Sequence, residues 1–348
     1  MVISHKKMVS VVIPTFNNGK YIIQALESVL SQSYREYEII IIDDGSTDGT
    51  RKLLEQFKDR TRYCYQENQG LAVARNRGLE ESRGEFITYL DADDVWLPDN
   101  LKMKVDVLQK HPELGGVFSD FTVFDERGII HPRGTKFVFP FFRRTGKDFP
   151  EIFSHEEKIS DGFAHEIKLY IGHVFSELFW GNFILPSSMV FRRDCALETG
   201  YFVPTMRTQQ DYEYWLRFSK NYPLAYVDEV LVRYRKHSDQ LTNHSNISRI
   251  FKAVIEIINR YESEFNGVNG RRQFNRRKSE LLLDLAKVYM DQKKAGDARR
   301  LLLTSRKLYP RRISTYVHMA MTFLPPRAIS FMRVVKRRGF TPQSHREI

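Results

Sequence analysis

The stretch IIIIDDGSTD, Ile39–Asp48, decides how the first part of the chain folds. Four β-branched residues in a row predict a strand that is buried on both faces of a sheet. The carboxylates, the glycine and the hydroxyl residues that follow are typical of turns and of helix N-termini. The stretch therefore predicts a strand that ends in an acidic turn and leads into a helix capped by Ser46 or Thr47, with Asp48 near the N-terminus of that helix.

The same alternation of strand and helix extends over roughly the first 110 residues. Short β-branched runs predict strands, and apolar side chains at helical spacing predict the helices between them. The predicted strands are Val9–Pro14, Glu38–Ile42, Thr61–Tyr65 and Glu85–Leu90, and the predicted helices are Tyr21–Leu30, Leu71–Ser82 and Leu101–Lys110. This order predicts an α/β fold, in which helices flank a Rossmann-like, mostly parallel sheet.

From Gly115 onward the pattern is less regular. Strands are predicted over Val117–Phe124, Phe183–Phe191 and Ala225–Arg235, a helix over Asp211–Ser219, and loop and helix over residues 145–180. After about Ser248 the chain becomes helical and rich in Lys and Arg, with a helical hairpin over Leu281–Pro310 and Gly296 near its turn. We therefore expect a domain over residues 1–248 and a basic, α-helical C-terminal region over residues 249–348.

The charge is unevenly distributed along the chain. Residues 251–348 carry 22 Lys or Arg and 8 Asp or Glu, although the net charge of the whole chain is +11. The first 250 residues have no basic surplus, which argues against nucleic acid as a partner. Cys64 and Cys195 belong to no Cys/His cluster, which excludes a disulfide scaffold or a zinc ribbon and fits a reducing compartment.

Targeting and membrane signals are not recognisable in the sequence. The first residues, MVISHKKM, lack the apolar stretch of a signal peptide. Nowhere do 18 apolar residues run together, so we expect no membrane-spanning helix. These observations predict a cytoplasmic protein.

Acidic residues follow two of the predicted strands. Asp43 and Asp44 follow the second strand, and the run DADD, Asp91–Asp94, follows the fourth. In sheets of this kind ligands bind outside the carboxyl ends of the strands, so both clusters lie at the binding edge. Single Asp pairs are commonly turn residues, but several carboxylates at one edge repel one another unless a cation joins them. The run therefore favours Mg²⁺ or Mn²⁺, with phosphate and water oxygens as further ligands.

Four phrases within residues 8–120 resemble, in order and spacing, the nucleotide-binding half of a family 2 inverting glycosyltransferase with the A-type fold. They are VSVVIPTFNNGKYIIQALESVLSQ, EIIIIDDGSTDGT, ENQGLAVARNRGLE and GEFITYLDADD, and weaker similarity extends to about residue 242. The resemblance implies transfer of a sugar from a nucleotide diphosphate sugar, usually of uridine, to an acceptor hydroxyl. It also implies a nucleotide-binding half over residues 1–120 and an acceptor half over residues 121–248.

The resemblance implies roles for individual residues. The implied nucleotide-binding set is Pro14, Thr15, Asp43, Asp44, Arg75, Asp91 and Ala92. Asp93 would bind the metal, together with His237 of the segment YRKHSDQLT. Asp211 of RTQQDYEYWLRF would be the catalytic base. The chain departs from the family pattern at Gln210, where a Glu is usual, and this leaves the positioning of the acceptor and the pKa of Asp211 open.

Structural interpretations and other functions stay open at this point. Arg75 could form an ion pair with a local Glu, Asp211 could cap a helix, and His237 could be a packed residue. A non-catalytic nucleotide-sugar-binding or scaffold protein would be expected to have lost Asp93 or Asp211, and both are present. A nucleotidyltransferase would normally carry a Gly-rich basic loop after the first strand, where this chain has PTFNNGK.

Residues 249–348 have three interpretations. The segment Leu285–Pro310 resembles a single tetratricopeptide-type hairpin, and one unit cannot form a solenoid, so a helical extension packed on the catalytic domain is one. The apolar segments Met319–Phe323 and Ala328–Met332, followed by RVVKRR, instead predict peripheral contact with an anionic membrane. That contact would suit a lipid-linked glycan acceptor, as in polysaccharide, glycolipid or cell-envelope glycan biosynthesis. Protein binding is the third interpretation.

Overall fold

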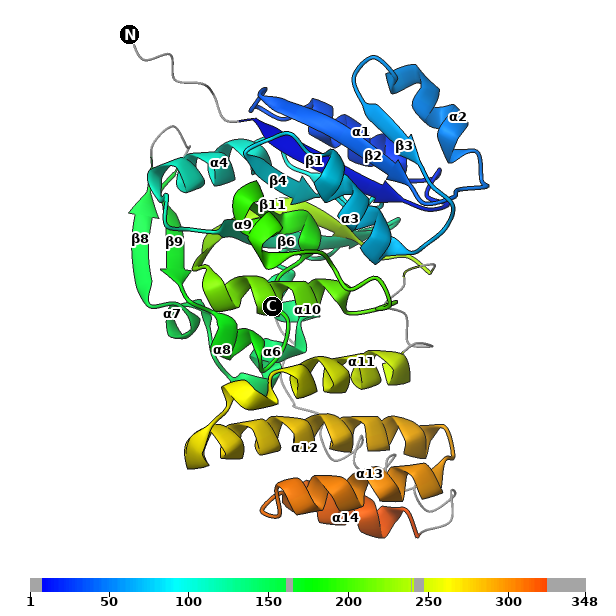
Figure 1. Cartoon of the computed structure of the whole chain (residues 1–348), viewed down its shortest axis with the longest axis vertical. Coiled ribbons are helices and arrows are strands. Elements are labelled where there is room, and N and C mark those ends of the chain that lie inside the picture. The colour runs from blue at the N-terminus through cyan, green and yellow to red at the C-terminus, as the bar shows by residue number, and fades with distance from the viewer. Residues whose placement is uncertain (1–7, 161–164, 239, 241–246, 324–348) are drawn as a thin grey trace, which may run out of the picture. The chain divides into compact units, whose positions relative to one another are not determined.

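The computed structural model describes residues 8–160, 165–238, 240 and 247–323. The chain divides into two compact units, residues 1–240 and 241–348. In Figure 1 the first unit contains the sheet and the second consists of helices. Within the described ranges, no helix is both long enough and apolar enough to cross a membrane. The predicted functional division, with a catalytic domain over residues 1–248 and a separate C-terminal region over residues 249–348, stays a prediction.

The first unit is built on a sheet that has eleven strands in the described residues. Its order is β3-β2-β1-β4-β10-β6-β11-β9-β8, while β5 pairs with β11 and β7 pairs with β6. The strands are β1 Val9–Thr15, β2 Tyr37–Asp43, β3 Arg62–Tyr65, β4 Phe86–Tyr89, β5 Val95–Trp96, β6 Gly116–Asp125, β7 Gly128–His131, β8 His155–Ile159, β9 Ile167–Gly172, β10 Met189–Arg192 and β11 Leu224–Arg235.

Most of the long strands share one direction. The first four strands pair in parallel, as their β-branched runs and intervening helices predict. Strand β10 is antiparallel to both β4 and β6, and β6 is parallel to β11. Strands β6 and β11 therefore run the same way as β1 to β4, and the carboxyl ends of all of these strands meet at one edge of the sheet.

Helices cover the sheet with their apolar sides. The helix α1 buries Ile22, Ala25, Leu26 and Val29, the stripe that its spacing predicts. The helices of the first unit are α1 Ile22–Leu30, α2 Thr50–Leu54, α3 Leu71–Glu81, α4 Asn100–Lys110, α5 Thr135–Val138, α6 Pro140–Thr145, α7 Phe149–Ile152, α8 Phe175–Leu178, α9 Arg193–Thr199 and α10 Gln210–Asn221.

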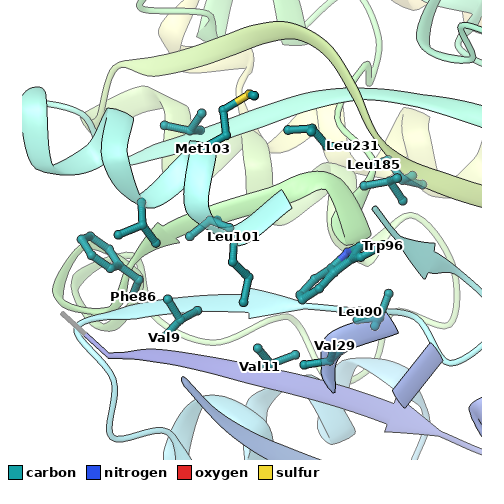
Figure 2. Close-up of a cluster of buried hydrophobic side chains, with 14 of the residues drawn as sticks. Val9, Val11, Val29, Phe86, Leu90, Trp96, Leu101, Met103, Leu185 and Leu231 are labelled. Atoms are coloured by element: carbon teal, nitrogen blue, oxygen red, sulfur yellow. The ribbon is translucent and has the colours of Figure 1, made fainter. Parts of the chain in front are cut away.

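One apolar cluster joins the two halves of the first unit. Figure 2 shows Val9 and Val11 of β1 near Leu90, Trp96 and Leu101, which come from the β4 to α4 region. The indole nitrogen of Trp96 donates a hydrogen bond to the carbonyl oxygen of Ser187 at 2.7 Å. Full burial of each side chain of this size stabilises the fold by about 1.5–3 kcal/mol. The cluster therefore fixes β4 against the segment that precedes β10.

The second unit is a set of consecutive helices, α11 Ile247–Arg260, α12 Gly267–Asp291, α13 Ala295–Leu308 and α14 Ile313–Met321. Leu283 and Ala286 of α12 pack on Ala298 and Leu302 of α13. The predicted helical hairpin is therefore present. The chain reverses at residues 292–294, and Gly296 follows in the first turn of α13.

Three local predictions from the sequence were wrong. Helix α2 begins after Gly49, which has φ +85° and no side-chain cap, because Ser46 and Thr47 bind the loop after β1 instead. The strand predicted from Phe183 begins at Met189, since Pro186 starts a short 3₁₀ turn. The stretch 145–180 contains the antiparallel pair β8 and β9 as well as helices.

Helix α4 contains a lysine that is fully buried. The side chain of Lys104 has no solvent exposure, and its ammonium nitrogen donates a hydrogen bond to Oδ1 of Asn100 one turn earlier. No acidic partner is shown for it among the described residues, and burial lowers the pKa of Lys104 well below its ordinary value. Burial therefore favours the neutral amine over the ammonium form of Lys104 in the fold.

We predict that the Lys104→Met variant gains stability over the natural chain as the pH falls. The unfolded chain takes up a proton on Lys104 below about pH 10.4, whereas the folded chain does so at a lower pH. As the pH falls, the free energy of unfolding of the variant should exceed that of the natural chain by a growing amount. The increase is up to about 1.4 kcal/mol per pH unit until the pH reaches the lowered pKa of Lys104. Urea unfolding between about pH 7 and pH 10 measures it. Lys102→Met, which removes a surface lysine paired with Asp106, is the control. A difference that stays constant with pH for Lys104→Met would contradict a lowered pKa of Lys104.

Candidate functional site

Hydrogen bonds join the loop after β1 to the loop after β2. Thr15 and Asp43 are neighbours in the register of the two strands. The amide of Asn17 donates to Ser46 Oγ at 2.9 Å, and the amide of Thr47 donates to Asn17 Oδ1 at 2.8 Å. The two loops therefore form one rigid rim at the carboxyl edge of the sheet. Within that rim Thr15 Oγ1 is buried, and no described residue hydrogen-bonds to it.

Asp43 and Asp44 are buried and accept hydrogen bonds from the protein itself. Asp43 accepts from the amide of Ser46 at 2.8 Å and from the hydroxyl of Tyr63 at 2.6 Å. Asp44 accepts from Gln66 Nε2 at 2.7 Å and from the amides of Gln69 and Gly70 at 2.9 and 2.7 Å. Both carboxylates thus stabilise the rim, whereas their predicted contact with a nucleotide stays a prediction.

Two positions around Asp44 need glycine, one next to it in the chain and one in the loop that it holds. Gly45 has φ +86°, and a Cβ there would lie 2.9 Å from the amide nitrogen of Asn68. Gly70 has φ +95°, and a Cβ there would lie 2.4 Å from Arg207 Nη1, which donates to the carbonyl oxygen of Gln69. Both positions combine a left-handed backbone with close approach, so larger residues would displace the loop.

The carboxylates of the DADD run differ in burial. The side chains of Asp91 and Asp93 retain 27% and 22% exposure, whereas Asp94 is buried. Asp94 accepts from Ser187 Oγ at 2.6 Å and from the amide of Arg235 at 3.1 Å. Burial first, and then the charges of Asp93 and Asp91, raise the pKa of Asp94 well above its usual range. Asp94 therefore has a structural role, and the other two carboxylates face the accessible side.

Arg75 forms an ion pair with the first of these carboxylates. Its Nη2 donates to Asp91 Oδ1 at 2.8 Å, and the buried guanidinium lies beside the rings of Tyr89 and Phe202. Burial raises the pKa of Asp91, and the charge of Arg75 opposes that rise. Arg75 thus forms an ion pair with Asp91, a predicted site residue, and not with the local Glu that the sequence left open.

His237 and Asp93, which lie 144 positions apart in the chain, come together at the site. His237 Nε2 lies 2.8 Å from Asp93 Oδ2, and the imidazole packs on the ring of Tyr21. Arg235 fixes this approach, because its Nε donates to the carbonyl oxygen of Asp93 at 2.8 Å. The structure thus brings the two predicted metal ligands into direct contact.

Asp93 and His237 fit a cation that takes its other ligands from a substrate. Within the described residues no group of three or more His, Cys, Asp or Glu side chains could hold a metal ion. A two-residue site suits Mg²⁺ or Mn²⁺, because these ions commonly keep phosphate and water oxygens as ligands. The residues present are therefore compatible with the predicted metal, and its binding stays a proposal.

Asp211 lies in the first turn of α10. Its Oδ2 accepts a hydrogen bond from Asn182 Nδ2 at 3.2 Å, and Asn182 Oδ1 in turn accepts from the amide of Ile184 at 3.0 Å. The second bond fixes which end of the Asn182 amide faces Asp211. Burial raises the pKa of Asp211, the charge of Arg75 opposes the rise, and the charge of Asp91 adds to it. The charges of Arg75 and Asp91 therefore both act on the Asp211 carboxylate, as expected for groups of one site.

Gln210 is buried beside Asp211, and no described residue hydrogen-bonds to its Oε1. The residue before it, Gln209, has φ +60°, which is unusual for a residue other than glycine. The start of α10 thus has a constrained backbone next to the predicted base.

Of the seven predicted nucleotide-binding residues, only Asp91 keeps a partly exposed side chain, and the side chains of Pro14, Thr15, Asp43, Asp44, Arg75 and Ala92 are buried. Pro14 and Ala92 are buried, so only their backbone could meet a ligand. A hollow of about 420 Å³ opens beside α3 and the 201–204 segment, but none of the predicted site residues lines it. This hollow is therefore separate from the predicted site residues.

Three residues that organise this edge could not be recognised from the sequence. Asn182 and Ser187 lie inside a segment that resembles the family, and Arg235 lies two residues before His237. Their hydrogen bonds join residues that lie 29 to 142 positions apart in the chain, so no local pattern contains them. Neighbours of the same type, such as Ser188, could not be told apart from them by sequence.

The family model and the known proteins that are similar to this chain all describe glycosyltransferases. A model of the glycosyl transferase family 2 matches residues 10–160. The putative teichuronic acid biosynthesis glycosyltransferase TuaG of Bacillus subtilis is 32% identical over 258 residues, which are 72% of this chain and 85% of TuaG. An uncharacterized glycosyltransferase of Rickettsia conorii is 26% identical over 245 residues, which are 68% of this chain and 36% of that protein. The chain thus spans about a third of the length of the latter relative.

Solved structures with low sequence identity share the fold. S. aureus TarS in complex with UDP-GlcNAc aligns with a TM-score of 0.57 at 16% identity, covering 86% of this chain and 82% of that one. The mannosyltransferase PcManGT from Pyrobaculum calidifontis, in complex with GDP-Man and Mn²⁺, aligns with a TM-score of 0.53 at 16% identity, covering 95% and 85%. The predicted mostly parallel sheet of the A-type glycosyltransferase fold, with helices at the C-terminus, is confirmed.

We predict that Asp44→Asn destabilises the protein in the absence of any nucleotide. The carboxamide cannot accept from all three donors of the 66–70 loop, so the free energy of unfolding should fall by about 1.5–3 kcal/mol. Thermal unfolding without ligand measures the change. Asp59→Asn, at an exposed position, should change it by less than about 0.5 kcal/mol. Unaltered stability of Asp44→Asn would show that Asp44 does not hold the loop.

Proposed function

The chain belongs to glycosyl transferase family 2, and we propose that it transfers a sugar from a nucleotide diphosphate sugar to an acceptor hydroxyl with inversion at the anomeric carbon. The observation that carries the proposal is the convergence of Asp91, Asp93 and His237 with Asp211 at the carboxyl edge of one sheet. The family membership supplies the reaction class, and the geometry supplies the groups that the reaction needs.

The donor nucleotide would lie at the rim formed after β1 and β2. The buried Thr15 hydroxyl offers a hydrogen-bonding group there, and Arg75 supplies positive charge beside Asp91. The rim is preorganised, because Asp43 and Asp44 already hold its loops by internal hydrogen bonds. We propose residues 1–120 as the donor half and residues 121–248 as the acceptor half on this basis.

A divalent cation, Mn²⁺ or Mg²⁺, would be held by Asp93 and His237. When bound, it would neutralise the charge that develops on the leaving diphosphate. Arg235 keeps both ligands in place through the backbone of Asp93. The mannosyltransferase PcManGT, which is similar in fold, was solved with Mn²⁺, which supports the choice of metal class.

Asp211 would act as the general base. Its carboxylate takes the proton of the acceptor hydroxyl while the hydroxyl oxygen forms a bond to the anomeric carbon. The bond from that carbon to the diphosphate oxygen breaks, and the nucleoside diphosphate leaves with the electron pair. A single displacement of this kind inverts the anomeric centre. Asn182 holds the carboxylate, and the raised pKa of Asp211 makes it a better proton acceptor than a solvated carboxylate.

The relatives suggest a role in cell-envelope glycan synthesis. TuaG is described as a putative teichuronic acid biosynthesis enzyme, and it shares 85% of its length with this chain. TarS was solved with UDP-GlcNAc, and PcManGT with GDP-Man. We therefore propose a UDP-sugar as donor and a carbohydrate or lipid-linked glycan as acceptor, acted on in the cytoplasm.

The proposal is tested with a panel of UDP- and GDP-sugars in the presence of Mn²⁺. One donor should raise the thermal unfolding temperature and be hydrolysed or transferred, and a chelator should remove both effects. Asp211→Asn should keep the donor-induced thermal shift while the rate falls by about 10²–10⁴-fold, the usual contribution of a general base. Retention of more than about a tenth of the rate would show that Asp211 is not the base. A chain that binds a donor without turnover would be a non-catalytic binding protein.

We predict that activity declines on the acid side at a higher pH than for a solvated carboxylate. The base must be ionised, and burial raises its pKa, so the rate falls as the pH drops through that raised value. Asn182→Ala removes a donor to the ionised form and should move the acid limb of the kcat profile to still higher pH. Asn221→Ala, at the exposed end of the same helix, should leave the profile unchanged. An Asn182→Ala profile that superimposes on that of the natural chain would contradict this role.

A further inference from the structure

Helix α14 of the second unit exposes its apolar side. Ile313, Tyr316 and Val317 are 78%, 43% and 51% exposed, and Ala320 continues the stripe one turn later. This spacing of i, i+3, i+4 and i+7 forms one face of a helix, which normally lies against a core. Thr315 instead is the fully buried residue of α14. The helix therefore exposes an apolar stripe, whereas Thr315 and the half-buried Met319 lie on the side packed against the unit.

Hydrogen bonds among hydroxyl groups hold α14 in this orientation. Ser305 Oγ of α13 donates to the carbonyl oxygen of Ser279 at 2.9 Å and lies 3.4 Å from Thr315 Oγ1. Near the other end, Arg299 donates to Thr322 Oγ1 at 3.0 Å. These contacts place the side of α14 that carries Thr315 against α13, where Met319 also packs on the apolar cluster, so the side with Ile313, Tyr316 and Val317 stays exposed. The exposure is thus a defined feature of the packing.

The stretch of chain that contains this helix is strongly basic. The sequence from Ala298 to Arg346 contains twelve Lys or Arg and no Asp or Glu. In the described part of that stretch, the side chains of Arg306, Lys307 and Arg311 are exposed on α13 and in the turn before α14. An apolar stripe beside cationic side chains has the pattern of a surface that lies in the interface of an anionic bilayer.

We propose that the face of α14 formed by Ile313, Tyr316, Val317 and Ala320 docks on an anionic lipid surface. The face could also be covered by a second copy of the chain or by residues 324–346 of the same chain, and charge favours lipid over both. A second copy of the chain would bring a second set of like charges to the face. Residues 324–346 of the same chain would add six more basic residues and no acidic one. Anionic lipid headgroups supply the opposite charge, and the acyl boundary supplies a place for the apolar side chains.

This proposal refines the membrane contact that the sequence predicts. Of the two predicted apolar segments, Ala328–Met332 and the basic run 333–338 lie outside the described residues. Met319 and Met321 of the other segment are half-buried, so the exposed stripe comes mainly from residues that precede it. The surface does not depend on the proposed catalytic role, because donor binding and turnover can be measured without lipid.

Flotation of the full chain with vesicles tests the proposal. The chain should bind vesicles of phosphatidylcholine with about 30% phosphatidylglycerol at low salt, and release them as salt screens the charges. Vesicles of phosphatidylcholine alone should bind little. The double variant Ile313→Ser/Val317→Ser should bind about tenfold more weakly, because two apolar side chains no longer enter the interface. Arg306→Gln/Lys307→Gln should weaken binding by about fivefold for each charge removed.

Val268→Ser is the matched control for the apolar variant. Val268 is also exposed and apolar and belongs to the same unit, but it lies on α12. Its substitution should leave vesicle binding unchanged. Absence of binding to anionic vesicles at low salt, or equal binding by the chain and its Ile313→Ser/Val317→Ser variant, would overturn the proposal. So would a dimer in sedimentation that this variant dissociates, since the face would then bind a second copy.

Discussion

A carboxyl group that is buried at the edge of a sheet requires hydrogen-bond donors, and Asp94 obtains them from Ser187 and Arg235. These donors lie 93 and 141 positions away in the chain, so one buried group joins the end of β4 to the segment before β10 and to the end of β11. The amide of Asp91 also donates to Ser187 Oγ at 3.1 Å. His237, two residues beyond Arg235, thereby reaches Asp93. The metal half of the proposed site thus depends on a residue that would bind neither metal nor substrate.

The acidic residues at the carboxyl edge of the sheet form two groups that differ in burial. Asp43, Asp44 and Asp94 are buried and accept hydrogen bonds from the fold, which makes them parts of the framework. Asp91, Asp93 and Asp211 are partly exposed and have fewer internal donors, so they remain available to a ligand. Like charges at one edge are tolerated because Arg75 lies beside Asp91, and His237 beside Asp93. The sequence alone does not separate the two groups, because Asp93 and Asp94 stand side by side in the same acidic run.

The sequence predicted the first half of the sheet well, because its strands and helices are encoded by local patterns. β-branched runs and a stripe such as Ile22, Ala25 and Leu26 need no distant partner to be recognised. Strands β5, β8 and β10 depend on pairing with remote segments, and Pro186 within an apolar run shifted the start of β10. In the site, resemblance to the family supplied Asp93, Asp211 and His237. The contacts of Asn182, Ser187 and Arg235 arise only when the chain has folded.

Periodicity shows that a helix has an apolar face, but it does not show what covers that face. The spacing of Ile313, Tyr316 and Val317 by itself predicts burial, and each side chain of this kind would gain about 1.5–3 kcal/mol from it. The fold instead buries Thr315 beside Ser305 and leaves the apolar side in contact with solvent. Hydroxyl pairs contribute less than such burial, about 0.5–1.5 kcal/mol for each hydrogen bond. An orientation that forgoes the stronger stabilisation by apolar burial is consistent with a second surface that restores this burial when the protein is bound. The basic residues around α14 indicate that such a surface is negatively charged.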